Sequence, residues 1–184
     1  MTPATSRWPG ARHFPDGVTL ETERLRLRLM EERDLEAFAV MYSDPETMQY
    51  IGEGKVLSRM DTWRSIAGVL GHWLLRGYGM WAVETKDTNQ LVGRLGFLDV
   101  EGWPGFELGW LIARPHWGKG YASEGSKAAY DYAIGMLKRE RVISLIRPGN
   151  ERSVRVAEKL GFVRDGAVEM MGKSALVYAN KRTA

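Results

Sequence analysis

Between residues 106 and 136 the sequence passes from a strand pattern through a loop with two glycines directly into a helix pattern. Phe106–Ile112 is apolar enough for a buried strand, and a helix is expected from about Ala122 to Met136. Between them, Gly118 and Gly120 permit backbone turn conformations that a side chain would forbid. The first turn of the helix offers amides without an intrahelical partner and the positive end of its dipole. This arrangement predicts a loop that binds phosphate, to which Lys119 adds a positive charge.

A loop with two glycines is by itself a weak signal, because an ordinary tight turn between strand and helix uses the same residues. Two common phosphate loops are excluded. A P-loop needs the pattern Gly-x-x-x-x-Gly-Lys-Ser/Thr, which this loop does not match. A Rossmann fingerprint needs a third glycine where this chain has Ser123, and the strands before the loop predict hairpins rather than crossovers.

The chain as a whole predicts one mixed α/β domain. Residues 21–30 alternate leucine with arginine, the period-two pattern of a single strand with one face in water. The further elements are expected, in order, as helices over 31–42 and 58–75, strands over 80–84, 91–98 and 106–112, a helix over 122–136, a strand over 142–146, a helix over 150–160, and strands over 162–169 and 174–179. Trp63, Ile66, Trp73 and Leu74 are expected on or near one face of the helix over 58–75. Residues 1–18 are expected to form a flexible arm, and residues 19–184 a single domain.

Composition excludes several classes of protein. The chain of 184 residues has no cysteine, so it has neither a disulfide nor a thiol nucleophile. Its 44% hydrophobic and 27% charged residues are ordinary soluble usage, which argues against disorder. No apolar run approaches the roughly 20 residues that span a bilayer, and the first residues lack the apolar centre of a signal peptide. A cytoplasmic protein without membrane or metal is therefore expected, since His13, His72 and His116 have no metal-ligand spacing.

Positive charge is concentrated toward the C-terminus, although the net charge is only +3. From Lys138 onward the chain has eleven basic and five acidic side chains. Such a region fits a polyanionic ligand, a nucleic acid or an ordinary solvated surface. The sequence has no nucleic-acid recognition motif and no aromatic side chains interleaved with the basic ones, which argues against nucleic acid.

A second motif lies in the helix expected over 150–160, where Asn150 is a good N-cap and Gly161 a good residue to follow the last turn. This helix and the loop Trp117-Gly118-Lys119-Gly120-Tyr121-Ala122 together resemble the GNAT superfamily of acetyl-CoA-dependent N-acetyltransferases. The superfamily loop pattern is Arg/Gln-x-x-Gly-x-Gly/Ala. Trp117 replaces the Arg/Gln, as is usual in the branch that includes the ribosomal-protein N-terminal acetyltransferases RimJ and RimL. The resemblance extends from Thr22 to Phe162.

The resemblance implies the GNAT fold of the α/β class, a mixed and largely antiparallel central sheet with a splayed strand pair and flanking helices. It also implies acetyl-CoA as the cosubstrate and no metal. In the family the splayed strand pairs with the pantetheine arm, the glycine loop holds the pyrophosphate, and the residue at Asn150 lies near the thioester. The alternative for Asn150 is that it only caps its helix. The implied cofactor-binding residues are Leu111, Ile112, Ala113, Trp117, Gly118, Lys119, Gly120, Tyr121, Ala122, Asn150 and Ser153.

The implied reaction is the attack of a neutral amine on a thioester. An alkylammonium has a pKa of roughly 10.4, so a base or a water relay must remove its proton. Glu107 is the candidate base, because carboxylates near this strand act as bases in many GNAT enzymes. The alternatives for Glu107 are an exposed strand residue and an anchor for the substrate ammonium. Asp99 and Glu101, in the preceding loop, are reserve candidates.

Two further groups are needed at the thioester. A backbone N–H near Leu111 is the expected donor to the developing oxyanion. For the departing thiolate, many GNAT enzymes use a tyrosine seven residues after the asparagine, but this chain has Ala157 there. Ser153 stands where this branch has serine and is expected to donate a hydrogen bond to the sulfur. Trp103, in a turn rich in glycine and proline, is a candidate for the acceptor pocket.

The expected function is direct transfer of the acetyl group from acetyl-CoA to a primary amine, either a protein N-terminus or a small molecule. A non-catalytic acyl-CoA-binding or regulatory module on the same fold is the alternative. The presence of Glu107, Asn150 and Ser153 argues against that module. The sequence does not choose the acceptor or the oligomeric state, for which a homodimer stays open.

Overall fold

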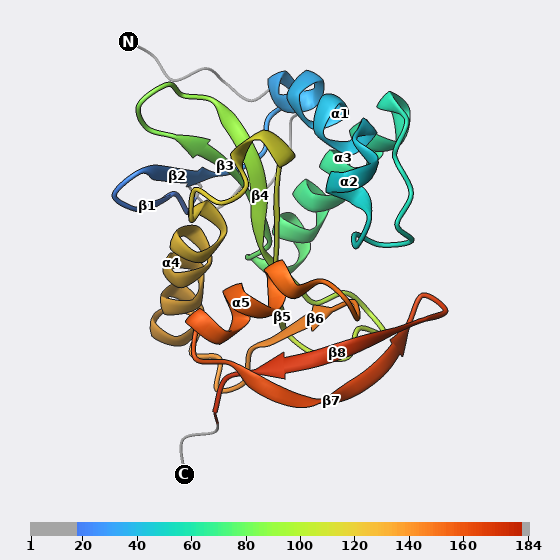
Figure 1. Cartoon of the computed structure of the whole chain (residues 1–184). Coiled ribbons are helices and arrows are strands. Elements are labelled where there is room, and N and C mark those ends of the chain that lie inside the picture. The colour runs from blue at the N-terminus through green and yellow to red at the C-terminus, as the bar shows by residue number, and fades with distance from the viewer. Residues whose placement is uncertain (1–17, 182–184) are drawn as a thin grey trace.

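The computed structural model describes residues 18–181, which form an open sheet with helices packed on its faces (Figure 1). His13 and all of the predicted arm except Val18 lie outside the described residues. The strands are β1 (Leu20–Glu21), β2 (Leu25–Arg28), β3 (Met80–Thr85), β4 (Leu91–Leu98), β5 (Glu107–Ile112), β6 (Ile143–Ile146), β7 (Val163–Met170) and β8 (Lys173–Ala179). The helices are α1 (Leu35–Ser43), α2 (Pro45–Met48), α3 (Arg59–Arg76), α4 (Tyr121–Gly135) and α5 (Glu151–Lys159), with short 3₁₀ turns at Glu32–Asp34 and Arg114–His116.

The sheet order is β1-β2-β3-β4-β5-β6-β8-β7, and all neighbouring strands are antiparallel except β5 and β6. These two parallel strands are paired only at Glu107 and Ile143 and then diverge. The prediction of a mixed, largely antiparallel sheet with one splayed pair is confirmed. The divergence leaves one edge of β5 without a strand partner, and the site described below lies there.

The prediction of one continuous strand over residues 21–30 is wrong. β1 and β2 are two short antiparallel strands, because the chain turns back at Thr22. The Thr22 hydroxyl accepts a hydrogen bond from the amide of Leu25, and the Thr22 amide donates to the Leu25 carbonyl. Such local side-chain bonding competes with an extended ladder, and leucine–arginine alternation does not reveal it. Leu27 and Leu25 are nevertheless fully buried, as the alternation predicts.

Helix α3 begins where the sequence places it. The Ser58 hydroxyl caps it by accepting from the amide of Asp61, and Gly77 ends it in the left-handed conformation. Ile66 and Trp73 are buried as expected, but Trp63 and Leu74 are each 49% exposed. The apolar stripe of α3 is therefore wider than the surface that the sheet covers. Among residues 18–181, no helix is long and apolar enough to cross a bilayer.

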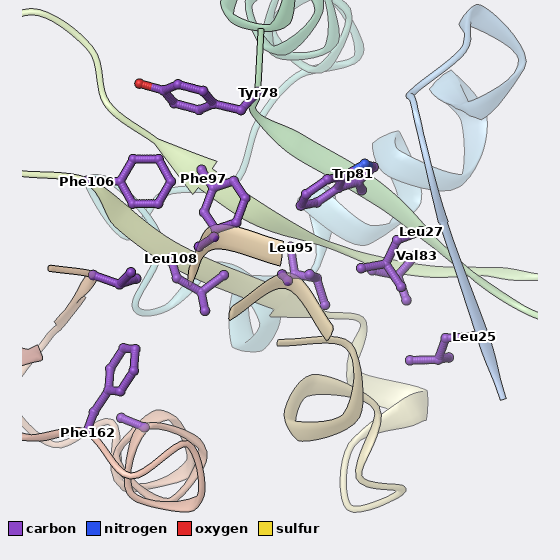
Figure 2. Close-up of a cluster of buried hydrophobic side chains, with 14 of the residues drawn as sticks. Leu25, Leu27, Tyr78, Trp81, Val83, Leu95, Phe97, Phe106, Leu108 and Phe162 are labelled. Carbon is purple, nitrogen blue, oxygen red and sulfur yellow. The ribbon is translucent and has the colours of Figure 1, made fainter. Parts of the chain in front are cut away.

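The core lies on both faces of the sheet. On the face toward α4 and α5, a cluster of buried side chains runs from β2 across β3 and β4 to β5 (Figure 2). Gly125 lets α4 approach the sheet closely, because a Cβ at that position would lie 2.5 Å from a methyl carbon of Leu95. On the other face, α1 and α3 pack on β3 and the end of β5 through side chains that include Phe38, Ile66, Met80 and Leu111. Because β5 is held from both faces, its backbone is a rigid support for the site.

Candidate active site

A cleft of about 610 Å³ opens where β5 and β6 diverge. It is bounded by the end of β5, the glycine loop with the start of α4, and the start of α5. Nine of the predicted cofactor-binding residues line it: Leu111, Ile112, Trp117, Gly118, Gly120, Tyr121, Ala122, Asn150 and Ser153. The structure thus brings the two sequence motifs together. Ala113 and Lys119 do not line the cleft, and Lys119 is exposed.

The glycine loop has the geometry of an anion site. Gly118 and Gly120 have φ of 77° and 84°, the left-handed region that side chains rarely adopt. Gly120 is the N-cap of α4, and the first helical bond runs from the Glu124 amide to the Gly120 carbonyl. The amides of residues 121–123 therefore have no acceptor within the helix. A phosphate group at this end of the cleft would meet these amides and the positive end of the α4 dipole.

Arg24, which directly precedes β2, holds this loop in place. The sequence patterns predicted no role for this residue. Its Nη1 donates to the carbonyl oxygen of Lys119 at 2.9 Å, and its Nε donates to Glu124 at 2.7 Å. The guanidinium also lies 5.0 Å from the ring centroid of Tyr121. Although burial works in the opposite direction, hydrogen bonds from Thr22 and Arg24 hold the pKa of Glu124 below its usual value. This ionised pair fixes the first turn of α4.

Trp117 and three basic side chains line the cleft next to the glycine loop. The Trp117 indole N–H donates to the carbonyl of Ile112 at 2.7 Å, which ties the loop to β5. The Arg152 guanidinium stacks 4.0 Å from the Trp117 ring centroid, and Arg155 and Lys159 of α5 also line the cleft. Part of the C-terminal positive charge therefore faces the cleft, as expected for a polyanionic ligand.

Asn150 caps α5, since its side-chain oxygen accepts from the Ser153 amide at 3.2 Å. It also lines the cleft, so capping and ligand contact are compatible. The Ser153 hydroxyl oxygen accepts a hydrogen bond from the Trp110 indole at 3.2 Å. Among the residues that the structure describes, the Ser153 hydroxyl donates no hydrogen bond, so its proton can point toward the cleft.

The free edge of β5 offers backbone groups to the cleft. The Ala113 amide bonds β4, whereas the Leu108 carbonyl accepts from Ser144 of β6. Because backbone groups alternate between the two edges of a strand, the amides of Trp110 and Ile112 face the splay and that of Leu111 faces β4. Of the amides near Leu111, those of Trp110 and Ile112 are therefore the ones that could donate into the cleft.

Glu107 lies in a second cavity of about 380 Å³. Its side chain is 8% exposed, so the alternative of an exposed strand residue is wrong. One carboxylate oxygen accepts from the Trp103 indole at 2.7 Å and the other from the Leu145 amide at 3.4 Å. Burial raises the pKa of Glu107 to about 7, against the opposing effect of these two donors and of nearby positive charge. Glu107 therefore changes protonation state near neutral pH.

The two reserve carboxylates lie elsewhere. Asp99 accepts from the Tyr78 hydroxyl at 2.6 Å, Glu101 is exposed, and neither lines a cavity around Glu107. Trp103, in contrast, lines the second cavity as its assignment to an acceptor pocket requires. The two cavities share Tyr50, Ile51, Trp110, Asn150 and Ser153. Tyr50 and Ile51 follow α2 and carry no motif, so sequence reasoning missed them.

The pKa of Glu107 has a consequence for stability. A carboxyl group whose pKa rises from 4.5 to about 7 on folding stabilises the fold fully below pH 4.5, and this contribution is lost as the pH rises through 7. The difference corresponds to roughly 3 kcal/mol. The free energy of unfolding of Glu107→Gln, minus that of the unmodified protein, should therefore increase from pH 5 to pH 8. Denaturant unfolding at both pH values measures the gain, with Glu101→Gln as an exposed control; an equal difference at both pH values would contradict the buried-carboxyl assignment.

A family model described as an acetyltransferase (GNAT) domain matches residues 24–163, about three quarters of the chain. The chain belongs to the GNAT acetyltransferase family. The resemblance drawn from the loop and helix motifs is confirmed, and the mixed sheet with one splayed pair is the GNAT fold.

Sequence relatives and solved structures agree with this GNAT assignment. The uncharacterized protein YkkB of Bacillus subtilis (strain 168) is 35% identical over 170 residues, which cover 88% of this chain and 95% of that protein. The uncharacterized N-acetyltransferase p20 of Bacillus licheniformis is 31% identical over 150 residues, covering 80% and 84%. A crystal structure of an acetyltransferase from Agrobacterium tumefaciens str. C58 has a TM-score of 0.79 at 31% identity and covers 89% of this chain and 94% of that one.

RimL, described as a ribosomal L7/L12 alpha-N-protein acetyltransferase in complex with coenzyme A, shares the fold. Its TM-score is 0.75 at 20% identity, and the match covers 88% of this chain and 97% of RimL. At this identity the likeness concerns the GNAT fold alone.

Proposed function

We propose that the protein transfers the acetyl group of acetyl-CoA directly to a primary amine, with Glu107 as the base. The observation that carries this proposal is a buried carboxyl group with a pKa of about 7, in a cavity that meets the phosphate-binding cleft. A base whose pKa lies near neutral pH is available in its ionised form and can still accept a proton. A non-catalytic acyl-CoA-binding module would not need such a group at this position.

The cleft fits acetyl-CoA in three parts. The free amides at the start of α4, with Arg152 beside them, would hold the pyrophosphate. The outward amide of Ile112 and the outward carbonyl of Trp110 would pair with the amide groups of the pantetheine arm. The thioester would then lie near Asn150 and Ser153, where the two cavities meet. The coenzyme A that RimL's description names, on the same fold, supports this assignment.

In the proposed reaction Glu107 takes a proton from the acceptor ammonium, directly or through one water. The neutral amine then attacks the thioester carbonyl carbon, so that a C–N bond forms and the C–S bond breaks. The amide of Trp110 donates to the carbonyl oxygen as negative charge develops there. The amine's second proton is lost as the amide product forms. Overall, one ammonium and acetyl-CoA give an acetamide, free CoA and one proton.

The departing thiolate is stabilised rather than fully protonated by a side chain. Ala157 supplies no acid at the position where many GNAT enzymes have tyrosine. The Ser153 hydroxyl, whose oxygen already accepts from Trp110, donates its free proton toward the sulfur. A serine hydroxyl is a weak acid, so water supplies the proton that completes free CoA.

The proposed activity is tested by an acceptor panel read as CoA release, which covers peptide N-termini and small amines. Release above the hydrolysis rate with any amine supports transfer. Binding of acetyl-CoA without release on the whole panel would favour the non-catalytic module.

Acetyl-CoA should raise the melting temperature, because a ligand bound by the native state alone stabilises it by mass action. Dephospho-CoA should bind roughly 10-fold more weakly than CoA, because Arg155 and Lys159 offer positive charge to the 3′-phosphate. Titration calorimetry with both ligands measures the ratio. Equal affinities would mean that the basic face of α5 does not bind the 3′-phosphate. The assignment of the pyrophosphate to the glycine loop would still stand.

A further inference from the structure

Arg94 and Glu107 lie on the same face of the sheet and line one cavity. Arg94 of β4 is paired with Leu111 of β5, and side chains two residues apart on β5 share a face, so Glu107 and Leu111 point the same way as Arg94. Between them lies the pair Gly96 and Gly109, which has no side chains to fill the space. Both Arg94 and Glu107 line the 380 Å³ cavity.

The charge of Arg94 acts on Glu107, whose pKa it works to lower, but within residues 18–181 its guanidinium forms no ion pair. Its Nε donates to the Tyr42 hydroxyl at 2.7 Å and its Nη1 contacts the Met80 sulfur at 3.5 Å. Among residues 18–181, its Nη2 donates no hydrogen bond and no salt bridge is formed, although the side chain is half-buried. Arg28, also half-buried, is by contrast paired with both Asp34 and Glu84. A half-buried guanidinium left unpaired beside a cavity is ready to bind an anion.

The other charged groups of the cavity are already used. Arg147 donates through both Nη atoms to the backbone carbonyls of Gly52, Met170, Lys173 and Ser174, so these two nitrogens are already bonded. Glu107 is the one carboxylate among the lining residues that the structure describes. A polyamine would therefore bring extra positive charge next to Arg94 with a single carboxylate to balance it.

The cavity has a volume of about 380 Å³, which suits a small acceptor. Arg147 donates to the Gly52 carbonyl and Lys173 to the Glu53 carbonyl, so the segment after α2 is tied to the turn between β7 and β8. Figure 1 shows this segment above the tip of the β7–β8 hairpin. The rest of the lining is largely apolar and includes Met80, Leu98, Trp103, Met170 and Met171.

We propose that Arg94 binds a carboxylate of the acceptor, and that the acceptor is a small amino acid with an apolar side chain. This inference rests on the proposed acetyl transfer, because it places the reacting amine at Glu107. The carboxylate accepts from Nη2 while the apolar side chain contacts the methionine-rich wall.

The test compares L-leucine with L-leucinamide as acceptors for the full-length protein, by CoA release. Leucine should have a KM roughly 10–100-fold lower, the usual range for a hydrogen-bonded charge pair. The amine of leucinamide is the more acidic of the two, so its easier deprotonation cannot produce this preference. Spermidine and an N-terminal peptide complete the panel and should be poor acceptors.

Arg94→Gln should raise the KM for leucine by that same factor and leave the KM for leucinamide within about 3-fold. Arg94→Lys should keep part of the preference, because the charge remains and the planar fork is lost. Arg64→Gln, which removes an exposed arginine of α3, is the matched control and should leave both values unchanged. The melting-temperature rise with acetyl-CoA shows that each variant is folded.

Equal KM values for leucine and leucinamide, an equal loss on both in Arg94→Gln, or a peptide as the fastest acceptor would each overturn the inference while acetyl transfer stands. If no acceptor released CoA, the proposed function would fail. In that case the leucine-induced rise in melting temperature of the CoA-bound protein still decides the role of Arg94. A rise with leucine that leucinamide and Arg94→Gln lack supports it, and its absence overturns it.

Discussion

Glu107→Gln is expected to lower kcat by roughly 10²–10⁴-fold, the range for loss of a general base. The substitution keeps the size of the side chain and one oxygen to accept the Trp103 indole N–H, so the cavity should keep its shape. The substitution removes the carboxylate that accepts the proton. Steady-state kinetics at saturating acetyl-CoA measure the loss.

The pH dependence distinguishes a base from a passive contact. In the unmodified enzyme kcat/KM should rise with pH through about 7, because Glu107 must be ionised to accept a proton. In Glu107→Gln this inflection should disappear. The deficit should also shrink as the pH approaches the pKa of the acceptor amine, because more acceptor then arrives neutral.

Ser153→Ala provides the comparison. This substitution removes the hydrogen bond to the departing sulfur, so it should lower kcat less than Glu107→Gln does. Its deficit should not shrink at high pH. If the Glu107→Gln deficit lay entirely in acceptor KM at every pH, Glu107 would be an anchor for the substrate ammonium. A water chain would then be the base, because Asp99 and Glu101 do not reach the cavity.

The parts of this structure that the sequence predicts are those encoded by neighbouring residues. The left-handed glycines of the loop and the Asn150 cap depend on local chemistry, and each is found at its expected position. The sequence also predicts the buried leucines of β2 but not the turn at Thr22, because both one strand and two short ones show the same alternation.

The chemistry of the site depends on distant pairings, and these are harder to predict. Burial raises the pKa of Glu107 and the hydrogen bond from Trp103 opposes that rise, and a strand pattern reports neither effect. Arg94 faces the same cavity because of the register between β4 and β5. Arg24 supports a loop that is 95 residues away in the sequence. Such contacts become visible only when the topology is known.

Gly120→Val should weaken acetyl-CoA binding by roughly 100-fold or more while the protein stays folded, because several charge-assisted bonds are lost together. A branched side chain is a strong outlier at φ of 84°, so the backbone of the loop must move. The valine would also occupy the space in front of the amides of residues 121–123, where phosphate is expected. Its Cβ would lie 3.4 Å from the flexible end of Arg24, a contact that the side chain can relieve.

Gly77→Val is the matched control for this change. Gly77 has φ of 76° and ψ of 8° against 84° and 1° at Gly120, so the backbone strain is the same, and a Cβ there would meet no atom within 4 Å. Gly77 lies at the end of α3, outside the cleft, so Gly77→Val should lose stability by a similar amount and keep its affinity for acetyl-CoA. Calorimetry on both variants separates strain from ligand contact. If Gly120→Val bound acetyl-CoA as tightly as Gly77→Val, the glycines would serve only the turn between β5 and α4, and the phosphate would have to be held by Arg152 and its neighbours on α5.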